Sequence, residues 1–201
     1  MTKKNLMIGI ALLLSAALIA VGCETTGESA GLGGALGAGA GAIIGHQSGH
    51  TVEGALIGAA VGALAGIIVH DIKAHQVRNA QQTAAQYNYA PAQGVRIVGE
   101  NGACSPGVIR PGGTVTTSVQ YAVLGAPPSG INITETRTLR QNGRVIKQVS
   151  SHDFMRTDGT WESTQEINFP ANTPPGAYEV SQSIRAPNAQ FDQNVVFNVA
   201  Q

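Results

Sequence analysis

Three patterns of apolar and polar residues follow one another along the chain. Residues 6–21 form an apolar stretch that only Gly9 and Ser15 interrupt. Glycine then recurs at every fourth position in two runs, with Ala, Leu, Ile and Val filling most positions between. From Gly94 onward, apolar and polar residues alternate. In order, these patterns predict a leader segment, a pair of packed helices and a domain of β-strands.

The glycine runs predict a helical hairpin over residues 31–70. Residues four apart share one helix face, so each run leaves a smooth groove that another helix backbone can approach closely. The eight glycines together cost about 6–8 kcal/mol of helix propensity, so these helices need packing against each other, other copies or lipid. A flexible Gly/Ala linker is the alternative, but the strict spacing disfavours it. The helix-packing glycines are Gly33, Gly37, Gly41, Gly45, Gly54, Gly58, Gly62 and Gly66.

The length of these helices leaves their membrane topology open. Each covers about 15–18 residues, or roughly 22–27 Å. A typical hydrocarbon core is about 30 Å thick, although the outer membrane is thinner. The hairpin therefore either spans the membrane or lies partly inserted.

The N-terminus predicts export. Lys3 and Lys4 precede the apolar stretch, and small residues lead to Cys23, so residues 1–22 have the form of a secretory signal peptide. The end of this segment, IAVGC, resembles a bacterial lipobox, and the resemblance implies that Cys23 is lipidated at the start of a tether over residues 23–30. An uncleaved signal anchor and cleavage without lipidation are the alternatives. In such lipoproteins an aspartate after the cysteine favours inner-membrane retention, so Glu24 implies the outer membrane.

The glycine-rich region carries a family resemblance. Residues 33–70, GGALGAGAGAIIGHQSGHTVEGALIGAAVGALAGIIVH, resemble the glycine-zipper two-helix domain of Gram-negative outer-membrane lipoproteins, including the rickettsial surface-antigen group. The resemblance covers the lipobox and about 40 residues, near the length of one helical hairpin. It implies a location in the outer membrane and says little about activity.

The remainder of the chain predicts a linker and a β-domain. Residues 71–93 are polar and rich in Ala and Gln, so the second helix is expected to continue to about Gln86 and to end before Pro91. Residues 94–201 contain about seven alternating segments, and Asn142-Gly143 is a strong hairpin signal between two of them. The segment TPPGAYEV from Thr173 resembles the entry to a late strand of bacterial immunoglobulin-like domains.

The expected fold is therefore α+β in separate regions: a glycine-zipper helical hairpin followed by an all-β, immunoglobulin-like antiparallel sandwich. The core of the sandwich is expected around Trp161, Phe154, Phe169, Phe197 and the Val and Ile positions. If Cys23 carries lipid, Cys104 has no partner, so the sandwich is expected to hold no disulfide and Cys104 to be a half-buried, inert thiol.

The charge of the chain argues against some classes of partner. The chain has 12 basic and 12 acidic residues, and removal of residues 1–22 takes away Lys3 and Lys4, which leaves 10 against 12 and a net charge of −2. No basic block is present, which argues against nucleic acid as a partner. Arg137, Arg140, Arg144 and Lys147 gather on the predicted hairpin and could meet a phosphate or an acidic partner, but a solvated strand edge is favoured.

The search for chemistry gives few candidates. The segment from Gly37 to Gly41 resembles a dinucleotide loop only superficially, because no strand precedes it. His46 and His50 are spaced to share a metal but lack further ligands, and His70 and His75 are expected where the helix leaves the membrane. We therefore expect no catalytic residue, no metal and no cofactor.

Three classes of function remain. The favoured one is a lipid-anchored structural envelope protein whose hairpin self-associates in membrane lipid and whose sandwich is presented to an unknown envelope protein, with the sandwich in the periplasm or at the surface. The second is an oligomeric pore built from the same helices, which would need a polar stripe where Ala, Leu and Ile stand. The third is an enzyme whose site is assembled by the β-domain loops.

Overall fold

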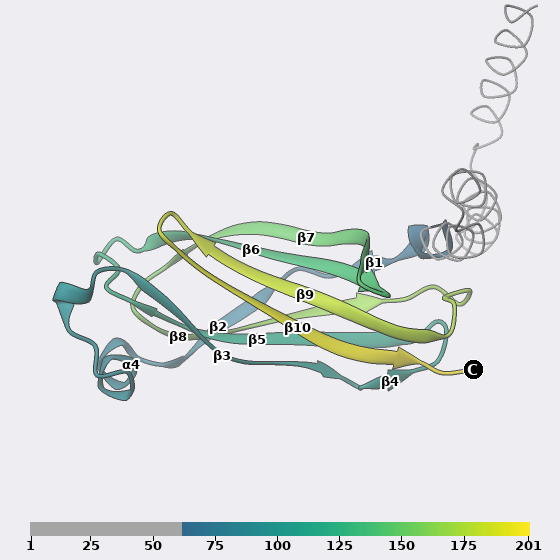
Figure 1. Ribbon diagram of the computed structural model, residues 1–201, viewed down its shortest axis with the longest axis horizontal. Helices are drawn as coiled ribbons and strands as arrows, with labels where there is room; N and C mark the ends of the chain where they lie inside the picture. Colours follow the sequence, from purple (N-terminus) through teal and green to yellow (C-terminus); the bar gives the residue numbers. More distant parts are fainter. Residues whose placement is uncertain (1–61) are drawn as a thin grey trace, which may run out of the picture.

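The computed structural model describes residues 62–201, which form two five-stranded sheets packed face to face (Figure 1). Side chains from both sheets meet between them, as in a β-sandwich. The predicted signal peptide, Cys23, the first six zipper glycines and the turn between the helices lie outside the described residues.

The first sheet has the order β1-β8-β5-β3, with β2 also pairing with β8. All of its pairings are antiparallel. Its strands are β1 (Ile68–Val69), β2 (Lys73–Arg78), β3 (Arg96–Ser105), β5 (Thr114–Leu124) and β8 (Gly159–Asn168).

The second sheet has the order β4-β10-β9-β6-β7. Its short edge strand β4 runs parallel to β10, whereas the other pairings are antiparallel. The sheet is thus mixed, where the sequence predicted only antiparallel pairing. Its strands are β4 (Val108–Ile109), β6 (Ile131–Gln141), β7 (Arg144–Arg156), β9 (Gly176–Ala186) and β10 (Ala189–Val199).

The structure confirms the strands that the alternating segments predict. Val115, Thr117, Val119, Tyr121 and Val123 are all buried along β5, as expected for one face of a strand against a core. Along β9, Tyr178, Val180, Gln182 and Ile184 are likewise buried.

The hairpin predicted at Asn142-Gly143 is confirmed as the connection between β6 and β7. Gln141 pairs with Arg144, and the two residues between them have φ angles of 51° and 75°. Two consecutive positive φ angles are those of the type I′ turn that matches strand twist.

Residues 68–93 differ from the prediction of a continuing helix and a linker. The helix ends early: Ala63 is followed by the 3-10 turn η1 (Leu64–Gly66), and the chain then forms β1 and β2 on the edge of the first sheet. The expected helix up to about Gln86 is wrong over 68–78. A separate helix, α4 (Ala80–Gln86), then begins at Asn79, whose side chain and that of Gln82 form a capping box.

Polar contacts hold α4 against the first sheet. Tyr87 donates a hydrogen bond of 2.7 Å to Glu100, which also forms an ion pair with Arg78. Burial alone would raise the pKa of Glu100, but its hydrogen bonds from Arg78 and Tyr87 hold that pKa below its usual range. Burial and the hydrogen bond to Glu100 raise the pKa of Tyr87 to about 12. After α4, the 3-10 turn η2 (Pro91–Gln93) leads into β3.

Two hydrophobic clusters fill the space between the sheets. One is centred on Phe169, Tyr178 and Phe197, and the other on Val119, Tyr121 and Ile184. Phe169 and Phe197 are core residues as predicted, and Trp161 packs against the second cluster. Phe154 is outside both clusters, which corrects its predicted place in the core; its ring lies 4.4 Å from the guanidinium carbon of Arg156.

Candidate functional site: the zipper junction and the buried ionic cluster

The end of the glycine-zipper segment is built into the core of the sandwich. Gly62 and Ala63 are its last α-helical residues within the described range, and Gly66 closes η1. Leu64 is only 1% exposed and belongs, with Ile67, to the first hydrophobic cluster. The zipper therefore does not lead into a free linker, because its last apolar residues already pack on the sandwich.

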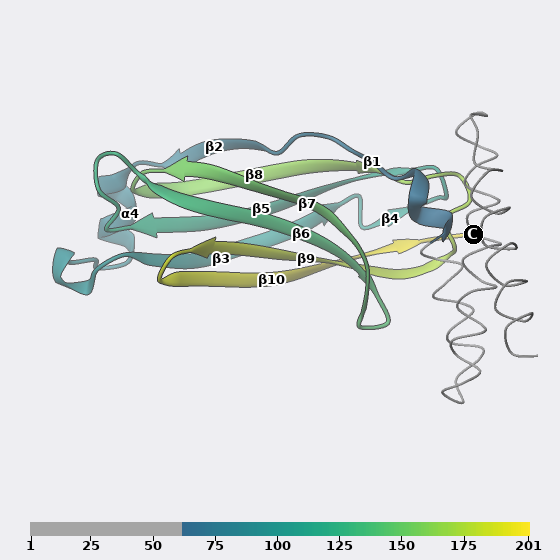
Figure 2. The same ribbon diagram turned by 90° about the horizontal axis from the view of Figure 1, so that it is seen from above.

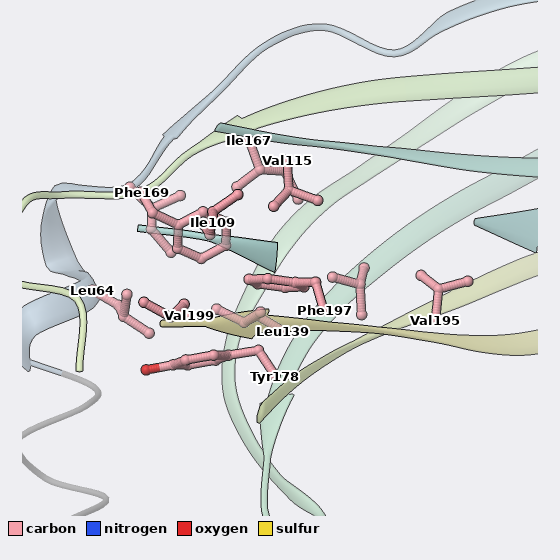
Figure 3. Close-up of a cluster of buried hydrophobic side chains, with 12 residues drawn as sticks. Leu64, Ile109, Val115, Leu139, Ile167, Phe169, Tyr178, Val195, Phe197 and Val199 are labelled. Atoms are coloured by element: carbon pink, nitrogen blue, oxygen red, sulfur yellow. The ribbon is translucent and has the colours of Figure 1, made fainter. Parts of the chain in front are cut away.

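Leu64 packs in a cluster that contains three aromatic rings, those of Phe169, Tyr178 and Phe197 (Figure 3). The rings of Phe169 and Phe197 are 5.1 Å apart, and those of Tyr178 and Phe197 are 5.6 Å apart and stacked. Tyr178 donates a hydrogen bond of 2.9 Å to the carbonyl of Pro174, which satisfies its hydroxyl at the rim of the cluster. The junction thus packs in a cluster of closely spaced aromatic rings.

Hydrogen bonds fix the chain immediately after the junction. The backbone N–H of His70 donates to the Glu166 carbonyl at 3.0 Å, and the side chain of Gln165 donates to the His70 carbonyl at 2.9 Å. Gln165 is buried and also accepts a hydrogen bond of 2.8 Å from Ser150. His70 therefore lies on the sheet edge beside β8, and His75 is in β2, 3.5 Å from Glu162.

A buried ionic cluster crosses the middle of the sandwich. Glu135 is fully buried, and its Oε1 accepts hydrogen bonds from Tyr121 at 2.7 Å, Ser163 at 2.9 Å and Arg156 at 3.0 Å. Tyr121 and Ser163 come from the first sheet, whereas Glu135 and Arg156 come from the second. One carboxylate therefore ties both sheets together.

Arg137 belongs to the same cluster and is 1% exposed. Its Nη2 donates to the Ser163 carbonyl at 3.2 Å, and its Nη1 lies 3.8 Å from Oε2 of Glu135, within ion-pair distance but too far for a hydrogen bond. Burial lowers the pKa of Arg137, and the charge of Glu135 opposes that shift. The predicted solvated edge is thus wrong for Arg137, although Arg140 does lie at the surface, paired with Glu179 at 3.5 Å.

Arg156 is held by rings as well as by hydrogen bonds. Its guanidinium carbon lies 4.4 Å from the ring centre of Phe154 and 4.8 Å from that of Trp161. Its Nε donates to the hydroxyl of Tyr121 at 3.1 Å. A cation over two aromatic faces is favourable even with little water present. Burial would lower the pKa of Arg156, but Tyr121 and Glu135 raise it overall.

The charged groups of this cluster are buried and paired with one another. The carboxylate of Glu135 is buried beside Arg156 and Arg137, and burial raises the pKa of Tyr121. Burial raises the pKa of the Cys104 thiol to about 12, which leaves it protonated and a poor nucleophile at neutral pH. Within residues 62–201, no group of three or more His, Cys, Asp or Glu side chains is placed to hold a metal ion.

The N-terminal segment has a family match. Residues 1–74 match the model of the YMGG-like Gly-zipper family. The match supports the glycine-zipper prediction and indicates a membrane-associated role. It runs through the junction and ends within β2. No helix of residues 62–201 has both the length and the apolar character that a membrane crossing requires.

The β-region resembles parts of several solved structures only distantly. A family 123 glycoside hydrolase from Clostridium perfringens is 12% identical, with 67% of this chain and 27% of that chain covered and a TM-score of 0.40. A β-glucosidase from Erythrobacter marinus is 12% identical, with 53% and 16% covered and a TM-score of 0.41. Titin domain M7 is 11% identical, with 53% and 96% covered and a TM-score of 0.32. No curated protein matches the chain.

Proposed function

We propose that this protein is a lipid-anchored structural protein of the bacterial outer membrane. In this proposal Cys23 carries the lipid, the glycine-zipper segment associates with the membrane and with other copies, and an immunoglobulin-like, non-catalytic sandwich is presented to protein partners. The family match over residues 1–74 supports the membrane association.

The continuity of zipper and sandwich carries the proposal. The matched segment extends through Leu64 and Ile67, which are core residues of the sandwich, and on into β2. A domain joined in this way is held next to the membrane at a fixed end. Such rigid attachment fits a structural or docking role. The burial of Glu135 and Arg137 inside the sandwich is consistent with a non-catalytic domain.

The anchor is tested by comparing Cys23→Ser with Cys104→Ser. The first change is expected to abolish labelling by a fatty-acid analogue and to release the protein from the outer-membrane fraction or mislocalise it. The second is expected to change neither, because Cys104 is a partly buried thiol of β3. Absence of label from the unmodified protein would remove the lipid anchor from the proposal.

Self-association is tested by filling the zipper groove. Gly41→Leu raises helix propensity by up to about 1 kcal/mol, yet it places a bulky side chain on the glycine face. Oligomers seen on native gels in mild detergent are therefore expected to weaken. Ala35→Leu adds comparable bulk at a position that is neither three nor four residues from a zipper glycine, and it serves as the control. Equal assembly by both variants would contradict zipper-mediated association.

A further inference from the structure

We propose that the end of the sandwich at which the zipper segment enters rests on the membrane surface and binds anionic lipid headgroups. We call it the junction end and define it by η1, β1, β4, the C-terminal part of β10 and the β6–β7 hairpin. This inference rests on the membrane association proposed above and adds a second, non-zipper contact with the bilayer.

The elements of the junction end lie together at one extremity of the sandwich. Figures 1 and 2 both show η1, β1, β4 and the end of β10 there, opposite α4. The pairings agree: Ile68 is opposite Asn168, which is also opposite Thr114, and Val108 is opposite Asn198. The chain continues from this end into the zipper segment.

Exposed apolar side chains concentrate at the junction end. Within residues 62–201, five large hydrophobic side chains are well exposed, and four of them, Ile68, Val108, Val145 and Val196, belong to its elements. The fifth, Met155, is near the other end of β7, where it pairs with Asn132. Scattered exposed apolar residues need no explanation, but such clustering marks an interaction surface.

Three of these side chains share the outer face of the second sheet. Val145 is opposite Arg140, Arg140 is opposite Glu179, and Glu179 is opposite Val196, so one row crosses four strands. Directly opposed residues point to the same side of a sheet. Val108 pairs two residues beyond Val196, opposite Asn198, and extends this face towards the tip.

Basic residues are frequent in the strand segments that contribute this apolar row. The segments of the second sheet at the junction end, residues 107–113, 139–148, 174–180 and 195–199, contain Arg110, Arg140, Arg144 and Lys147 but only one acidic residue, Glu179. Four positive side chains against one negative give an excess of three. Arg and Lys beside apolar side chains suit the interface of a bilayer, where anionic headgroups lie next to acyl chains.

The zipper segment continues directly into the sandwich, and this link makes the membrane the partner that we assign to this surface. Ala63, Leu64 and Ile67 are buried in the sandwich, which leaves little free chain between the sandwich and a membrane-associated segment. The junction end is therefore brought close to lipid whenever the zipper is in the membrane. A second copy or a soluble protein has no comparable constraint that would bring it to this face.

The test places a fluorescent label at matched positions of the full-length, membrane-purified protein. In a Cys104→Ser background, Val145→Cys and Val196→Cys probe the junction end, and Met155→Cys is the control, because the three native side chains are 55%, 58% and 60% exposed. Each variant is labelled with the environment-sensitive dye NBD and reconstituted into phosphatidylcholine vesicles with or without phosphatidylglycerol. Flotation reports membrane association, and nitroxide-bearing lipids report contact with the bilayer.

The expected result is quenching by the nitroxide lipids at positions 145 and 196, none at 155, and stronger quenching when phosphatidylglycerol is present. Floating protein without quenching at 145 and 196 overturns the inference but leaves the proposed function standing. A blue-shifted but unquenched label shows that protein covers this face and also overturns it. Equal quenching in both vesicle types overturns the role of the basic residues. Protein that fails to float, or a Cys104→Ser parent that takes the label at Cys23, refutes the proposed function itself.

Discussion

Replacing Glu135 by Ala is expected to lower the free energy of unfolding of the sandwich by about 3–5 kcal/mol. Glu135 is fully buried and accepts three hydrogen bonds through one oxygen, so its removal leaves Arg137 and Arg156 charged in the core without a counter-ion. Denaturant unfolding of the full chain in mild detergent measures the change. Trp161, the single tryptophan, provides the signal because its ring lies 4.8 Å from the guanidinium of Arg156.

Glu179→Ala is the matched control for this prediction. Glu179 also pairs with an arginine, Arg140, but both side chains are about one-third exposed on the outer face of the second sheet. Solvent screening limits such a pair to less than about 1 kcal/mol. Similar losses from both variants would show that burial of the charge does not set the cost.

The sequence does contain a signal for the inward position of Glu135 and Arg137, although their charge suggests an exposed position. Ile133, Glu135, Arg137 and Leu139 share one parity along β6, and both apolar members are fully buried. Because every second side chain of a strand points to the same face, Glu135 and Arg137 lie between two core residues. By charge alone, Arg137 groups instead with its basic neighbours on the hairpin. The partners Tyr121, Ser163 and Arg156 lie 14, 28 and 21 residues away from Glu135. They meet it because the two sheets pack face to face and because β7 pairs with β6.

The strands with a clear local signal were predictable, and those defined by distant partners were not. The β6–β7 hairpin follows from Asn142-Gly143, whose backbone suits the required turn. By contrast, β2 has the sequence KAHQVR, with little apolar alternation, and it forms because the edge of β8 supplies partners. The short β4 likewise depends on the parallel edge of β10. Local propensity gives way to tertiary pairing at both edges.

Tertiary pairing also explains why the sequence does not show where the second zipper helix ends. The sequence Ile67-Ile68-Val69 continues the apolar character of the zipper and therefore predicts a continuation of its second helix. In the structure Ile67 is buried in the first hydrophobic cluster, whereas Ile68 and Val69 pair with Asn168 and Ile167 of β8. β-branched residues are weak helix formers and suit a strand edge. The apolar run therefore belongs partly to the end of the zipper segment and partly to β1, and its composition does not show where the first ends and the second begins.

Replacing Leu64 by Ala is expected to destabilise this junction by about 2–5 kcal/mol. Leu64 is 1% exposed in the cluster formed by Phe169, Tyr178, Phe197 and neighbouring aliphatic residues, so its truncation leaves a cavity under the end of the zipper segment. The loss is measured by denaturant unfolding followed at Trp161. Because η1 precedes β1 and β2 directly, detachment is also expected to expose the Lys73 peptide bond to trypsin and to separate the zipper from the sandwich faster.

Ile68→Ala tests whether packing at the junction is responsible. Ile68 is four residues further along and 55% exposed, so its truncation is expected to change stability by no more than about 0.5 kcal/mol. Equal sensitivity of the two positions would mean that the zipper segment is only tethered to the sandwich. A loss confined to Leu64→Ala, with faster cleavage at Lys73, would establish that the end of the zipper segment is part of the sandwich core. The proposed attachment of the β-domain to the membrane at a fixed end depends on this packing.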